Sequence, residues 1–503
     1  MNPSSFWIDT VSRLGYPKLE NDLRVDALIV GGGITGLTAA YLLGKTGHSV
    51  AVVERGHIGQ GETGHTTAHI TYVTDARLSD LVKRFGRNHA QAAWDAGANA
   101  MARIQAIVAE VGIDCELRTV PGFLVAAANA EPKENERLRQ EAVLASELGF
   151  DATFVEQAPV FGRPAIRLAN QFKFHPMRYL EALAQEIVRN GGHVFEQTEV
   201  GEFHKDPRRV DVGSHSIAFD FVVVATHVPL QGNIGTLSAA LLQTKLAGYS
   251  TYAIEARIPS GTLPEMLCWD TSDPYVYLRV DRHEDGDVLI LGGEDHKTGQ
   301  KTDTAACFQR LEQTLHTMLR DMPVVERRWS GQVIESVDGL PYIGEIEKGQ
   351  FIATGFAGNG MTFGTLAGMM ACDVVTGAKN PWRDLFAVER KTLSATWDYL
   401  RENSDYPFYF AKGYLTGAES TELAGLASGE GKIVRVDGRK VAAFRDDEGK
   451  VRVFSPICPH LGCVVAWNEA ERTWDCPCHG SRFQATGEVI NGPAEKNLEE
   501  IKL

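Results

Sequence analysis

Apolar and polar positions near the N-terminus follow the order of a strand, a turn, a helix and a second strand. The apolar run VDALIV at 25–30 ends at a glycine-rich turn, and LTAAYLLGK after the turn is predicted to be a helix. A second apolar run, VAVV, follows at 50–53, and a third, FVVVAT, begins at 221. Apolar strands joined by helices are typical of a parallel sheet, so the pattern predicts an α/β fold.

Shorter strands dominate the C-terminal end. From Lys432 the text KIVRVDGRKVAAFRDDEGKVRVFSP alternates β-rich stretches with turns at Asp437-Gly438 and Glu448-Gly449. We expect a small all-β domain over 418–503. The preceding segment, 388–417, is predicted to be a linker with one helix near 388–402, followed by an aromatic, irregular connector.

Composition and charge narrow the class of protein. Of the 503 residues, 44% are hydrophobic and 23% are charged, as in ordinary globular proteins of several domains. The 50 Lys and Arg against 65 Asp and Glu give a net charge of −15, which disfavours binding to nucleic acid. No apolar run reaches the ~18 residues of a membrane-spanning helix, and the first residues lack the apolar stretch of an export signal. We expect a cytoplasmic protein without a transmembrane segment.

The cysteines fall into two groups. Four lie in two short motifs, Cys-x-His-x-Gly-Cys at 458–463 and Cys-x-Cys-His-Gly-Ser at 476–481. Thiolates and imidazoles in both motifs suit a soft metal site with mixed sulfur and nitrogen ligands. Zinc is the general alternative, but a zinc finger places its two cysteines in one motif and its two histidines in the other. The other four cysteines are isolated and are expected to be small buried hydrophobic residues: Cys115, Cys268, Cys307 and Cys372.

The two motifs resemble the Rieske 2Fe-2S signature in the version found in cytochrome bc1 and b6f complexes. Histidine ligands raise the reduction potential of such a cluster above that of an all-cysteine cluster. The resemblance also implies a disulfide between Cys463 and Cys478 that braces the two cluster loops. It implies that a cysteine pair holds one iron and a histidine pair holds the other: Cys458 and Cys476, and His460 and His479.

Further residues of this region match the same signature. Ser481 corresponds to a hydroxyl that hydrogen-bonds a cluster sulfur, and Gly492-Pro493 to a loop that covers the cluster. Where high-potential members have a tyrosine, this chain has Phe483, so one O–H···S hydrogen bond is missing. We expect a lower reduction potential than in those complexes.

The glycine-rich turn near the N-terminus has the spacing of a dinucleotide site. Gly31 and Gly33 allow a tight turn and the close approach of a pyrophosphate to the helix N-terminus, and Gly36 lets the helix pack on the strand. Glu54 ends the second strand, where its carboxylate would bind ribose hydroxyls and repel a 2′-phosphate. The cofactor is therefore expected to be FAD or NAD rather than NADP.

Three further segments favour FAD. A Gly/Thr-rich loop at 55–69 follows the second strand, FVVVAT begins at 221, and DGLPYIG at 338–344 leads to FIATGFAGNGMTFG at 351–364. Together they resemble the superfamily of D-amino-acid oxidase, glycine oxidase and sarcosine oxidase. The resemblance implies a Rossmann-like FAD-binding domain and an antiparallel substrate sheet within residues 1–387. The FAD-binding part would come from three segments, with the substrate sheet between them: 25–85, 150–235 and 330–385.

The matching positions define the expected FAD contacts. The second glycine-rich turn would place backbone N–H groups and a helix N-terminus against the flavin, which stabilises its reduced anionic form. His65 aligns with a histidine that some relatives bond covalently to flavin, but its flanking residues differ, so a covalent link and an ordinary polar contact are both open. The expected contacts are Gly31, Gly33, Ile34, Thr35, Gly36, Glu54, Arg55, His65, Thr66, Thr67, Gly355, Gly358, Asn359, Gly360, Met361 and Thr362.

Two departures from the superfamily favour a dehydrogenase over an oxidase. Sarcosine-oxidase-like members attach flavin to a cysteine near 335–337, where this chain has Glu-Ser-Val. The oxidases also place a lysine over the flavin to activate dioxygen, and the corresponding strand here is Leu-Ile-Leu-Gly at 289–292. Ile290 has no charge with which to stabilise superoxide.

The candidate catalytic residues are Arg279, Tyr277, His175 and Asn359. QFKFHPMRYL predicts a strand that enters a helix just after His175, and it resembles a stretch of γ-glutamylputrescine oxidoreductases. Tyr275, Tyr277 and Arg279 alternate and would share one face of a strand. If that face looks onto the flavin, Arg279 could bind a carboxylate beside an aromatic wall; a solvated edge strand is the alternative. Asn359 lies in the second glycine-rich turn.

Two redox centres in one chain predict a path for electrons. An amine or (N-methyl) amino acid, the small-molecule substrate class implied by the superfamily, would reduce FAD at its C–N bond. FAD would then pass single electrons to the cluster and on to an external partner, such as a ferredoxin-like protein or a quinone. Three alternatives stay open: reversed electron flow for a reductive or monooxygenase reaction, an oxidase whose cluster is structural, and a non-catalytic electron carrier or redox sensor.

Overall fold

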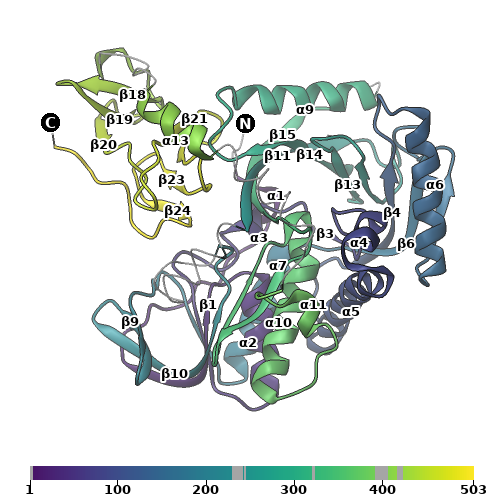
Figure 1. Ribbon diagram of the computed structural model, residues 1–503, viewed down its shortest axis with the longest axis horizontal. Coiled ribbons are helices and arrows are strands. Elements are labelled where there is room, and N and C mark those ends of the chain that lie inside the picture. Colours follow the sequence, from purple (N-terminus) through teal and green to yellow (C-terminus); the bar gives the residue numbers. More distant parts are fainter. Residues whose placement is uncertain are drawn as a thin grey trace.

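The computed structural model describes residues 4–228, 242, 245–319, 323–390, 406–415 and 423–502. Two large sheets occupy the N-terminal part of the chain, and two small sheets form a C-terminal domain, coloured light green to yellow in Figure 1. This is the α/β fold with a second, antiparallel sheet and a small all-β C-terminal domain expected from the sequence, so that prediction is confirmed.

The first sheet is parallel because its central strands are apolar on both faces. Its order is β16-β17-β10-β1-β2-β7, in which β16 is antiparallel to β17 and the β8–β9 hairpin extends from β10. The bounds are β1 Leu23–Val30, β2 Val50–Val53, β7 His193–Phe195, β8 Phe203–Lys205, β9 Arg208–Val212, β10 His215–Val224, β16 Tyr342–Glu347 and β17 Gln350–Thr354.

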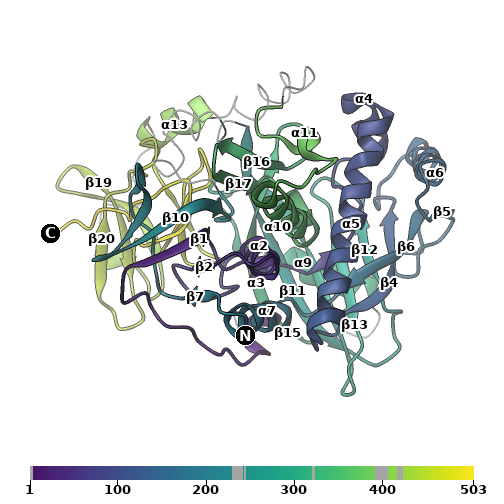
Figure 2. The same cartoon turned by 90° about the horizontal axis from the view of Figure 1, so that it is seen from below.

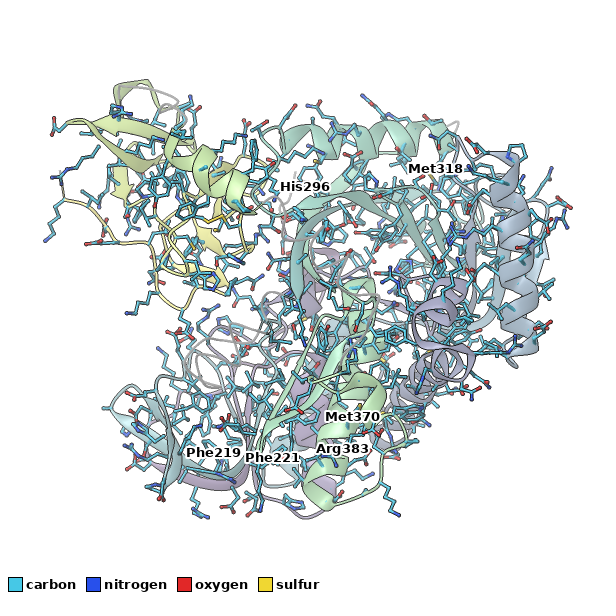
Figure 3. All side chains as sticks on the ribbon, viewed as in Figure 1. Phe219, Phe221, His296, Met318, Met370 and Arg383 are labelled. Carbon is cyan, nitrogen blue, oxygen red and sulfur yellow. A yellow bond between two sulfur atoms is a disulfide. The ribbon has the colours of Figure 1, made fainter. Side chains whose placement is uncertain are left out.

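Three helices cover one face of the parallel sheet: α2 (Ile34–Lys45), α7 (Pro176–Arg189) and α10 (Gly360–Thr376). They stack beside one another in Figure 2, and Met370 of α10, labelled in Figure 3, lies in their shared core. The long helix α5 (Arg87–Val111) packs against α10, and the β8–β9 hairpin covers the opposite face of the sheet. Three short helices complete this part: α1 (Phe6–Asp9), α3 (Glu62–His65) and α11 (Arg383–Phe386).

The second sheet has the order β15-β11-β14-β13-β12-β4-β6-β3, with β5 paired to β6; we call it the substrate sheet. All its pairs are antiparallel except β12 with β4. Helix α9 (Ala305–Met318) packs on β11 and β14, α6 (Pro132–Glu147) packs on β5 and β6, and α4 (Leu78–Phe85) lies between α5 and α6. The strands are β3 His69–Ile70, β4 Arg118–Val125, β5 Ala152–Val155, β6 Ala165–Lys173, β11 Leu246–Ile258, β12 Leu267–Asp270, β13 Tyr277–Asp281, β14 Asp287–Lys297 and β15 Val325–Ser336.

The chain leaves the substrate sheet for the parallel sheet at His175, between β6 and α7. Strands β3, β5 and β6 therefore belong to the substrate sheet, although they fall in segments that the sequence assigned to the FAD-binding part. The reason is pairing: β6 is hydrogen-bonded to β4 along most of its length, and β3 and β5 attach to β6. Sequence pattern alone does not reveal these partners.

The C-terminal domain is built from two small antiparallel sheets. One has the order β18-β19-β20 and the other β21-β22-β23-β24. The turn between β18 and β19 has positive φ at both Asp437 (47°) and Gly438 (80°), as a tight hairpin turn requires. The bounds are β18 Gly431–Val436, β19 Arg439–Arg445, β20 Val451–Phe454, β21 Ala466–Asn468, β22 Thr473–Asp475, β23 Arg482–Gln484 and β24 Val489–Asn491, with a short 3₁₀ turn, η2, at Leu423–Gly425.

The segment before this domain corrects one expectation. The helix expected near 388–402 lies mostly outside the described residues, whereas the connector expected to be irregular contains helix α13, Tyr406–Leu415. Packing explains the difference: Gly413 fits closely against Val464, and the Tyr414 hydroxyl donates a 2.7 Å hydrogen bond to the carbonyl of Gly462. Among the described residues, no helix is long and apolar enough to cross a lipid bilayer.

Candidate functional site

A cavity of about 2130 Å³ opens where the parallel sheet, the substrate sheet and the C-terminal domain meet. Its walls come from the turn after β1, the loop after β2, the β11, β13 and β15 strands, the turn before α10, and the strands β22 to β24. One cavity therefore brings the dinucleotide motif together with β22 to β24 of the C-terminal domain, the domain that carries the two cysteine-histidine motifs.

The first glycine-rich turn is shaped for a close ligand. Gly31 has φ +112°, and a Cβ atom there would lie 2.5 Å from the carbonyl oxygen of Ala225. A Cβ at Gly36 would collide with the carbonyl of Gly31, so Gly36 brings helix and strand together. Helix α2 begins at Ile34, and Gly33, Ile34 and Thr35 at its N-terminus line the cavity, which is a favourable place for a pyrophosphate.

Glu54 is held in place at the end of β2. One carboxylate oxygen accepts the N–H of Gly32 and the other accepts the N–H of Gly56, both at 2.8 Å. Each oxygen retains a further lone pair, and Glu54 lines the cavity. The carboxylate can therefore accept hydroxyl hydrogen bonds from a ribose, and this end of the cavity fits the adenosine half of FAD.

The second glycine-rich turn forms the other wall. β17 ends at Thr354, the 3₁₀ turn η1 covers Ala357–Asn359, and α10 starts at Gly360. Three of the expected FAD contacts do not line the cavity: Gly36, Gly355 and Thr362. The Thr362 hydroxyl donates a 2.8 Å hydrogen bond to the carbonyl of Thr71. The others line the cavity: Gly31, Gly33, Ile34, Thr35, Glu54, Arg55, His65, Thr66, Thr67, Gly358, Asn359, Gly360 and Met361.

His65 ends α3 and contributes to the same wall. Its Nδ1 atom lies 3.0 Å from the carbonyl of Gly61, and its own carbonyl accepts the indole N–H of Trp329 at 2.9 Å. The ring is oriented by a polar contact within the chain and faces the cavity.

Aromatic and polar side chains gather at the end of the cavity next to the second turn. The rings of Tyr275 and Tyr277 lie 5.5 Å apart, and the Tyr277 hydroxyl lies 2.7 Å from the hydroxyl of Thr251 on β11. The Tyr277 ring packs directly over Gly292, its cross-strand partner. Burial lowers the pKa of His69, which contacts Tyr277, to about 4, so this histidine is neutral at pH 7.

Two carboxylates at this end were missed by the sequence argument. Asp75 accepts a 2.7 Å hydrogen bond from the N–H of Gly358 and is exposed to the cavity. Asp295 lies near Thr251, and burial, reinforced by the charge of Asp75, raises its pKa to about 7. Asp75 follows β3 and Asp295 lies near the end of a different strand, β14, so no local motif links them.

Arg279 does not have the role that its strand position suggested. Its guanidinium makes five hydrogen bonds inside the protein: two to Asp281, and one each to the carbonyls of Thr67, Ala68 and Phe174. The side chain is 2% exposed and does not line the cavity. All its donors are used, so Arg279 ties the loop after α3 to β13 and is not available to a substrate carboxylate.

His175 is likewise a structural residue. It caps the N-terminus of α7, where Nδ1 accepts the N–H of Arg178 at 3.3 Å, and its Nε2 lies 3.0 Å from the Thr10 hydroxyl. Burial lowers its pKa to about 3, and it does not line the cavity. Of the four candidate catalytic residues, only Tyr277 and Asn359 face the cavity.

The C-terminal motifs form a compact donor set. Cys458 and Cys476 are each 1% exposed, and the rings of His460 and His479 lie 4.9 Å apart with their Nδ1 atoms buried. A hydrogen bond between the two thiols lowers the pKa of Cys458 to about 7 and raises that of Cys476. Two thiols and two imidazoles converging in this way fit a cluster with mixed ligands.

A disulfide joins the two loops that carry these donors. Cys463 and Cys478 are bonded, with their Cα atoms 6.5 Å apart. Within each loop a backbone hydrogen bond of 2.8 Å closes the turn, from Cys458 N–H to the Cys463 carbonyl and from Cys476 N–H to the Ser481 carbonyl.

The second cluster loop, 476–481, rests on the substrate sheet. Gln332 donates a 2.7 Å hydrogen bond to the carbonyl of Gly480, and Gln300 donates a 3.0 Å hydrogen bond to that of Pro477. A Cβ atom at Gly299 would lie 2.8 Å from the carbonyl carbon of Cys476, so the backbones are in direct contact. This places the cluster loop against a wall of the flavin-side cavity.

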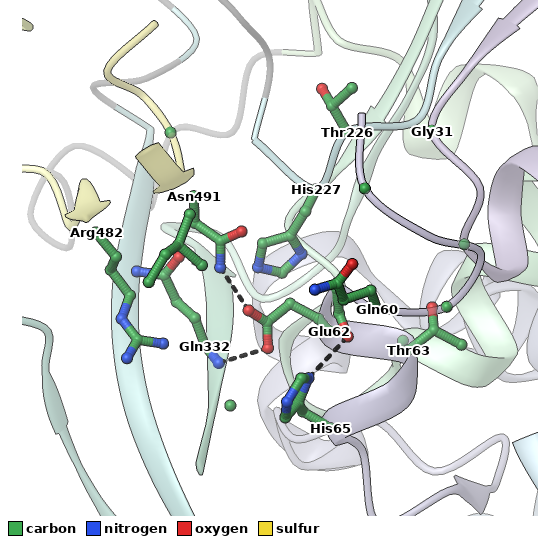
Figure 4. Close-up of a pocket in the computed structure, with 18 of the residues that line it drawn as sticks. Gly31, Gln60, Glu62, Thr63, His65, Thr226, His227, Gln332, Arg482 and Asn491 are labelled. Carbon is green, nitrogen blue, oxygen red and sulfur yellow. Dashed lines mark hydrogen bonds between the residues drawn. The ribbon is translucent and has the colours of Figure 1, made fainter. Parts of the chain in front are cut away.

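Charged and polar contacts continue this interface toward the first glycine-rich turn. Glu62 of α3 accepts hydrogen bonds from the Asn491 side chain (2.5 Å) and the Gln332 N–H (2.6 Å), as Figure 4 shows. Arg55 donates to the carbonyl of Ile490 at 2.6 Å. Buried Arg482 forms ion pairs with Glu471 and Asp475 beside the cavity.

Comparison with known families matches both parts of the chain. Residues 26–374 match the model of the DAO family, described as FAD dependent oxidoreductase, and residues 417–502 match the Rieske [2Fe-2S] domain. The chain is 32% identical over 509 residues to YhfW of Bacillus subtilis, whose name describes it as a putative Rieske 2Fe-2S iron-sulfur protein. The match covers 100% of this chain and 98% of that protein.

Two further matches concern the N-terminal part. Gamma-glutamylputrescine oxidoreductase of Escherichia coli is 23% identical over 396 residues, covering 75% of this chain and 89% of that protein. The crystal structure of glycine oxidase from Geobacillus kaustophilus superposes with a TM-score of 0.62 at 20% identity, covering 73% of this chain and 99% of that one. This likeness supports the same fold.

Proposed function

Since this chain belongs to the DAO family of FAD-dependent oxidoreductases and carries a C-terminal Rieske [2Fe-2S] domain, we propose that it is an amine or amino-acid dehydrogenase whose electrons leave through the cluster. Both resemblances drawn from the motifs are confirmed, and the cofactors are FAD and a Rieske 2Fe-2S cluster. What we propose beyond the family and its cofactors is the class of electron donor, a C–N compound, and the path of electrons from the flavin to the cluster.

In the proposed reaction a C–N bond loses two electrons. When bound, FAD accepts a hydride equivalent from the carbon and the cluster carries one electron at a time. The nitrogen releases a proton, water adds to the resulting imine, and the products are an aldehyde or oxo acid and either ammonia, from a primary donor, or an amine, from an N-substituted donor. The two electrons pass singly to an external one-electron acceptor, such as a ferredoxin-like protein, or to a quinone.

The proposed domain bounds and ligands are those expected from the sequence. Residues 1–387 would form the oxidoreductase unit, 388–417 the linker and 418–503 the Rieske domain. Cys458 and Cys476 would hold one iron, and His460 and His479 the other. The N-terminus of α2 and the carboxylate of Glu54 would bind the adenosine diphosphate, and the turn before α10 would face the flavin.

The observation that carries the proposal is the contact between Gln332 and the cluster loop. Gln332 donates to the Gly480 carbonyl while its N–H binds Glu62, so one residue of β15 joins the Rieske loop to the wall of the FAD cavity. A cluster with no redox part in the reaction would not need a loop docked on the wall of that cavity. The names of two relatives, an amine oxidoreductase and an amino-acid oxidase, support a C–N donor.

The side chain at position 290 favours a dehydrogenase over an oxidase, because Ile290 stands where the related oxidases place a lysine that activates dioxygen. This side chain is fully buried in the apolar core, so no cationic side chain is offered there to dioxygen. A one-electron cluster within the same chain supplies another outlet for the electrons.

Anaerobic electron paramagnetic resonance (EPR) of the purified holoprotein tests this function. The protein is mixed with a panel of diamines, N-methyl amino acids and α-amino acids, and the signal of the reduced Rieske cluster is followed. We expect the signal to appear with at least one of these donors. A cluster that dithionite reduces, while every C–N donor leaves both flavin and cluster oxidised, would contradict the proposal. A titration placing the cluster potential below that of the flavin would favour electron flow in the opposite direction.

A further inference from the structure

The end of the cavity beside the second glycine-rich turn is acidic. A Cβ atom built on Gly358 would lie 3.1 Å from both carboxylate oxygens of Asp75 and 2.9 Å from the Tyr275 hydroxyl, so these groups crowd the flavin-side turn. Burial, reinforced by the charge of Asp75, raises the pKa of Asp295, and burial together with both carboxylates raises the pKa of Tyr275. Asp75 and Tyr275 line this end of the cavity, and Asp295 lies behind its wall.

Asp295 has unused hydrogen-bonding capacity. Its Oδ1 atom is buried and has no hydrogen-bond partner in the described part of the chain, although the Thr251 hydroxyl contacts the carboxylate. A buried carboxylate oxygen without a partner is costly unless a ligand completes its shell. Thr251 also contacts the Tyr277 hydroxyl, and both Thr251 and Tyr277 line the cavity, so the carboxylate sits directly behind the cavity wall.

No basic side chain among the described residues balances these acids. Arg279 is fully bonded inside the protein, and His69 is neutral at pH 7. Every arginine that lines the cavity is paired with a carboxylate of the protein: Arg55 with Glu199, Arg328 with Glu312, Arg472 with Asp447, and Arg482 with Glu471 and Asp475. The two lining lysines are elsewhere, Lys18 before β1 and Lys496 in the C-terminal domain.

Aromatic rings complete the surroundings. Tyr275, Tyr277 and Trp269 all line this region, and the faces of such rings attract ammonium groups. Carboxylates behind an aromatic wall form a site for an organic cation, whereas a substrate carboxylate would meet like charges without a counter-ion.

We propose that Asp75 and Asp295 select a cationic amine that lacks an α-carboxylate, such as an alkyl diamine, as the substrate of this dehydrogenase. The inference rests on the proposed function and narrows its donor class. One carboxylate balances the distal ammonium group, and the other is placed to receive the proton that the reacting ammonium must lose before its carbon can give up a hydride.

Equilibrium binding to the flavin-loaded protein tests the selection without turnover. The probes are tert-butylammonium, which has no hydrogen on the carbon next to nitrogen and cannot be oxidised, and pivalate, which has a similar shape and the opposite charge. Perturbation of the flavin absorption spectrum reports binding. We expect tert-butylammonium to bind at least about tenfold more tightly than pivalate at pH 8, because the carboxylates attract the cation and repel the anion.

Asp295→Asn and Asp75→Asn should each reduce this ratio by about tenfold. Glu469→Gln is the matched control, because Glu469 is an exposed carboxylate that lines the same cavity from the C-terminal domain; it should leave the ratio unchanged. Flavin content and the cluster signal show whether each variant is intact. If both variants fail to fold, the relative affinity of the unmodified protein for tert-butylammonium and pivalate still tests the proposed cation selection.

A second comparison tests the selection of cationic amines separately from the proposed dehydrogenase activity. Putrescine and ornithine differ by the α-carboxylate alone, as do cadaverine and lysine. We expect the diamines to reduce the flavin anaerobically much faster than the amino acids do. Equal or faster reduction by ornithine, or tighter binding of pivalate, overturns the cation selection and leaves the dehydrogenase intact. Failure of all C–N donors overturns both.

Discussion

The side-chain amide of Gln332 donates a 2.7 Å hydrogen bond to the carbonyl of Gly480, the residue after His479 in the second cluster loop. The same amide lies 3.2 Å from the Thr298 hydroxyl, and Gln332 is 2% exposed. This buried contact joins the substrate sheet to the loop that carries a proposed iron ligand.

Gln332→Leu should weaken docking of the cluster loop. Leaving the Gly480 carbonyl without its partner costs about 1–3 kcal/mol, which corresponds to at least about a fivefold change in a docking equilibrium. In anaerobic stopped-flow mixing with a reducing amine, reduction of the cluster should slow by about fivefold or more, while reduction of the flavin keeps its rate. Gln140→Leu, on the exposed surface of α6, is the control. Equal slowing of both phases would instead point to a defect at the flavin.

Gly31→Ala should abolish retention of FAD. The added Cβ would lie 2.5 Å from the Ala225 carbonyl, and φ is +112°, where a side chain is strained. The turn must then move away from the position where it admits a pyrophosphate. The ratio of flavin to polypeptide after purification measures the loss. Gly44→Ala in α2 meets no atom within 4 Å and should retain flavin, with up to about 1 kcal/mol of added helix stability.

Contiguous motifs were predictable from sequence because their chemistry is local. The turn at Gly31 and the loop at Cys458 each contain the spacing that defines the site. Asp75 and Asp295 could not be found in this way, since the fold of β3 and β14 brings them together. For Arg279, the alternation of the sequence predicted a strand face but could not predict the hydrogen-bond partner of the side chain. The guanidinium that was expected to bind substrate donates instead to Asp281, two residues further along the chain.

The double variant Cys463→Ser, Cys478→Ser should lose its cluster at a lower temperature. The disulfide closes a loop with a sequence separation of 15, for which chain entropy gives about 3 kcal/mol of stabilisation. Heating while following the Rieske EPR signal measures the loss of the cluster. Flavin retention should be unaffected, because the two cysteines lie only in the C-terminal domain. Cys372→Ser, at a cysteine without a disulfide, provides the comparison.

Binding of tert-butylammonium should strengthen as pH rises through about 7. Burial raises the pKa of Asp295 to about 7, and the charges of Asp75, Glu294 and Asp273 act in the same direction. Below that pH the carboxyl group is protonated and neutral, so it does not attract a cation; above it the carboxylate is formed. The probe stays charged over this range, as aliphatic amines titrate near ~10. Dissociation constants measured from pH 5.5 to 8.5 should level off at high pH. Asp295→Asn should flatten the profile, and dissociation constants that rise with pH would contradict this assignment.

Arg279→Gln tests whether this arginine supports the fold or binds substrate. Burial disfavours the charge on Asp281, but Arg279 and Lys173 lower its pKa to about 2, so it is ionised in the folded protein. Removing the guanidinium leaves that carboxylate with Lys173 alone and breaks the bonds to Thr67 and Ala68. We expect a loss of about 3–5 kcal/mol in the free energy of unfolding, measured by denaturant titration. In molecules that remain folded, the preference for tert-butylammonium over pivalate should persist. A variant of normal stability that loses binding of α-amino acids would return Arg279 to the substrate site.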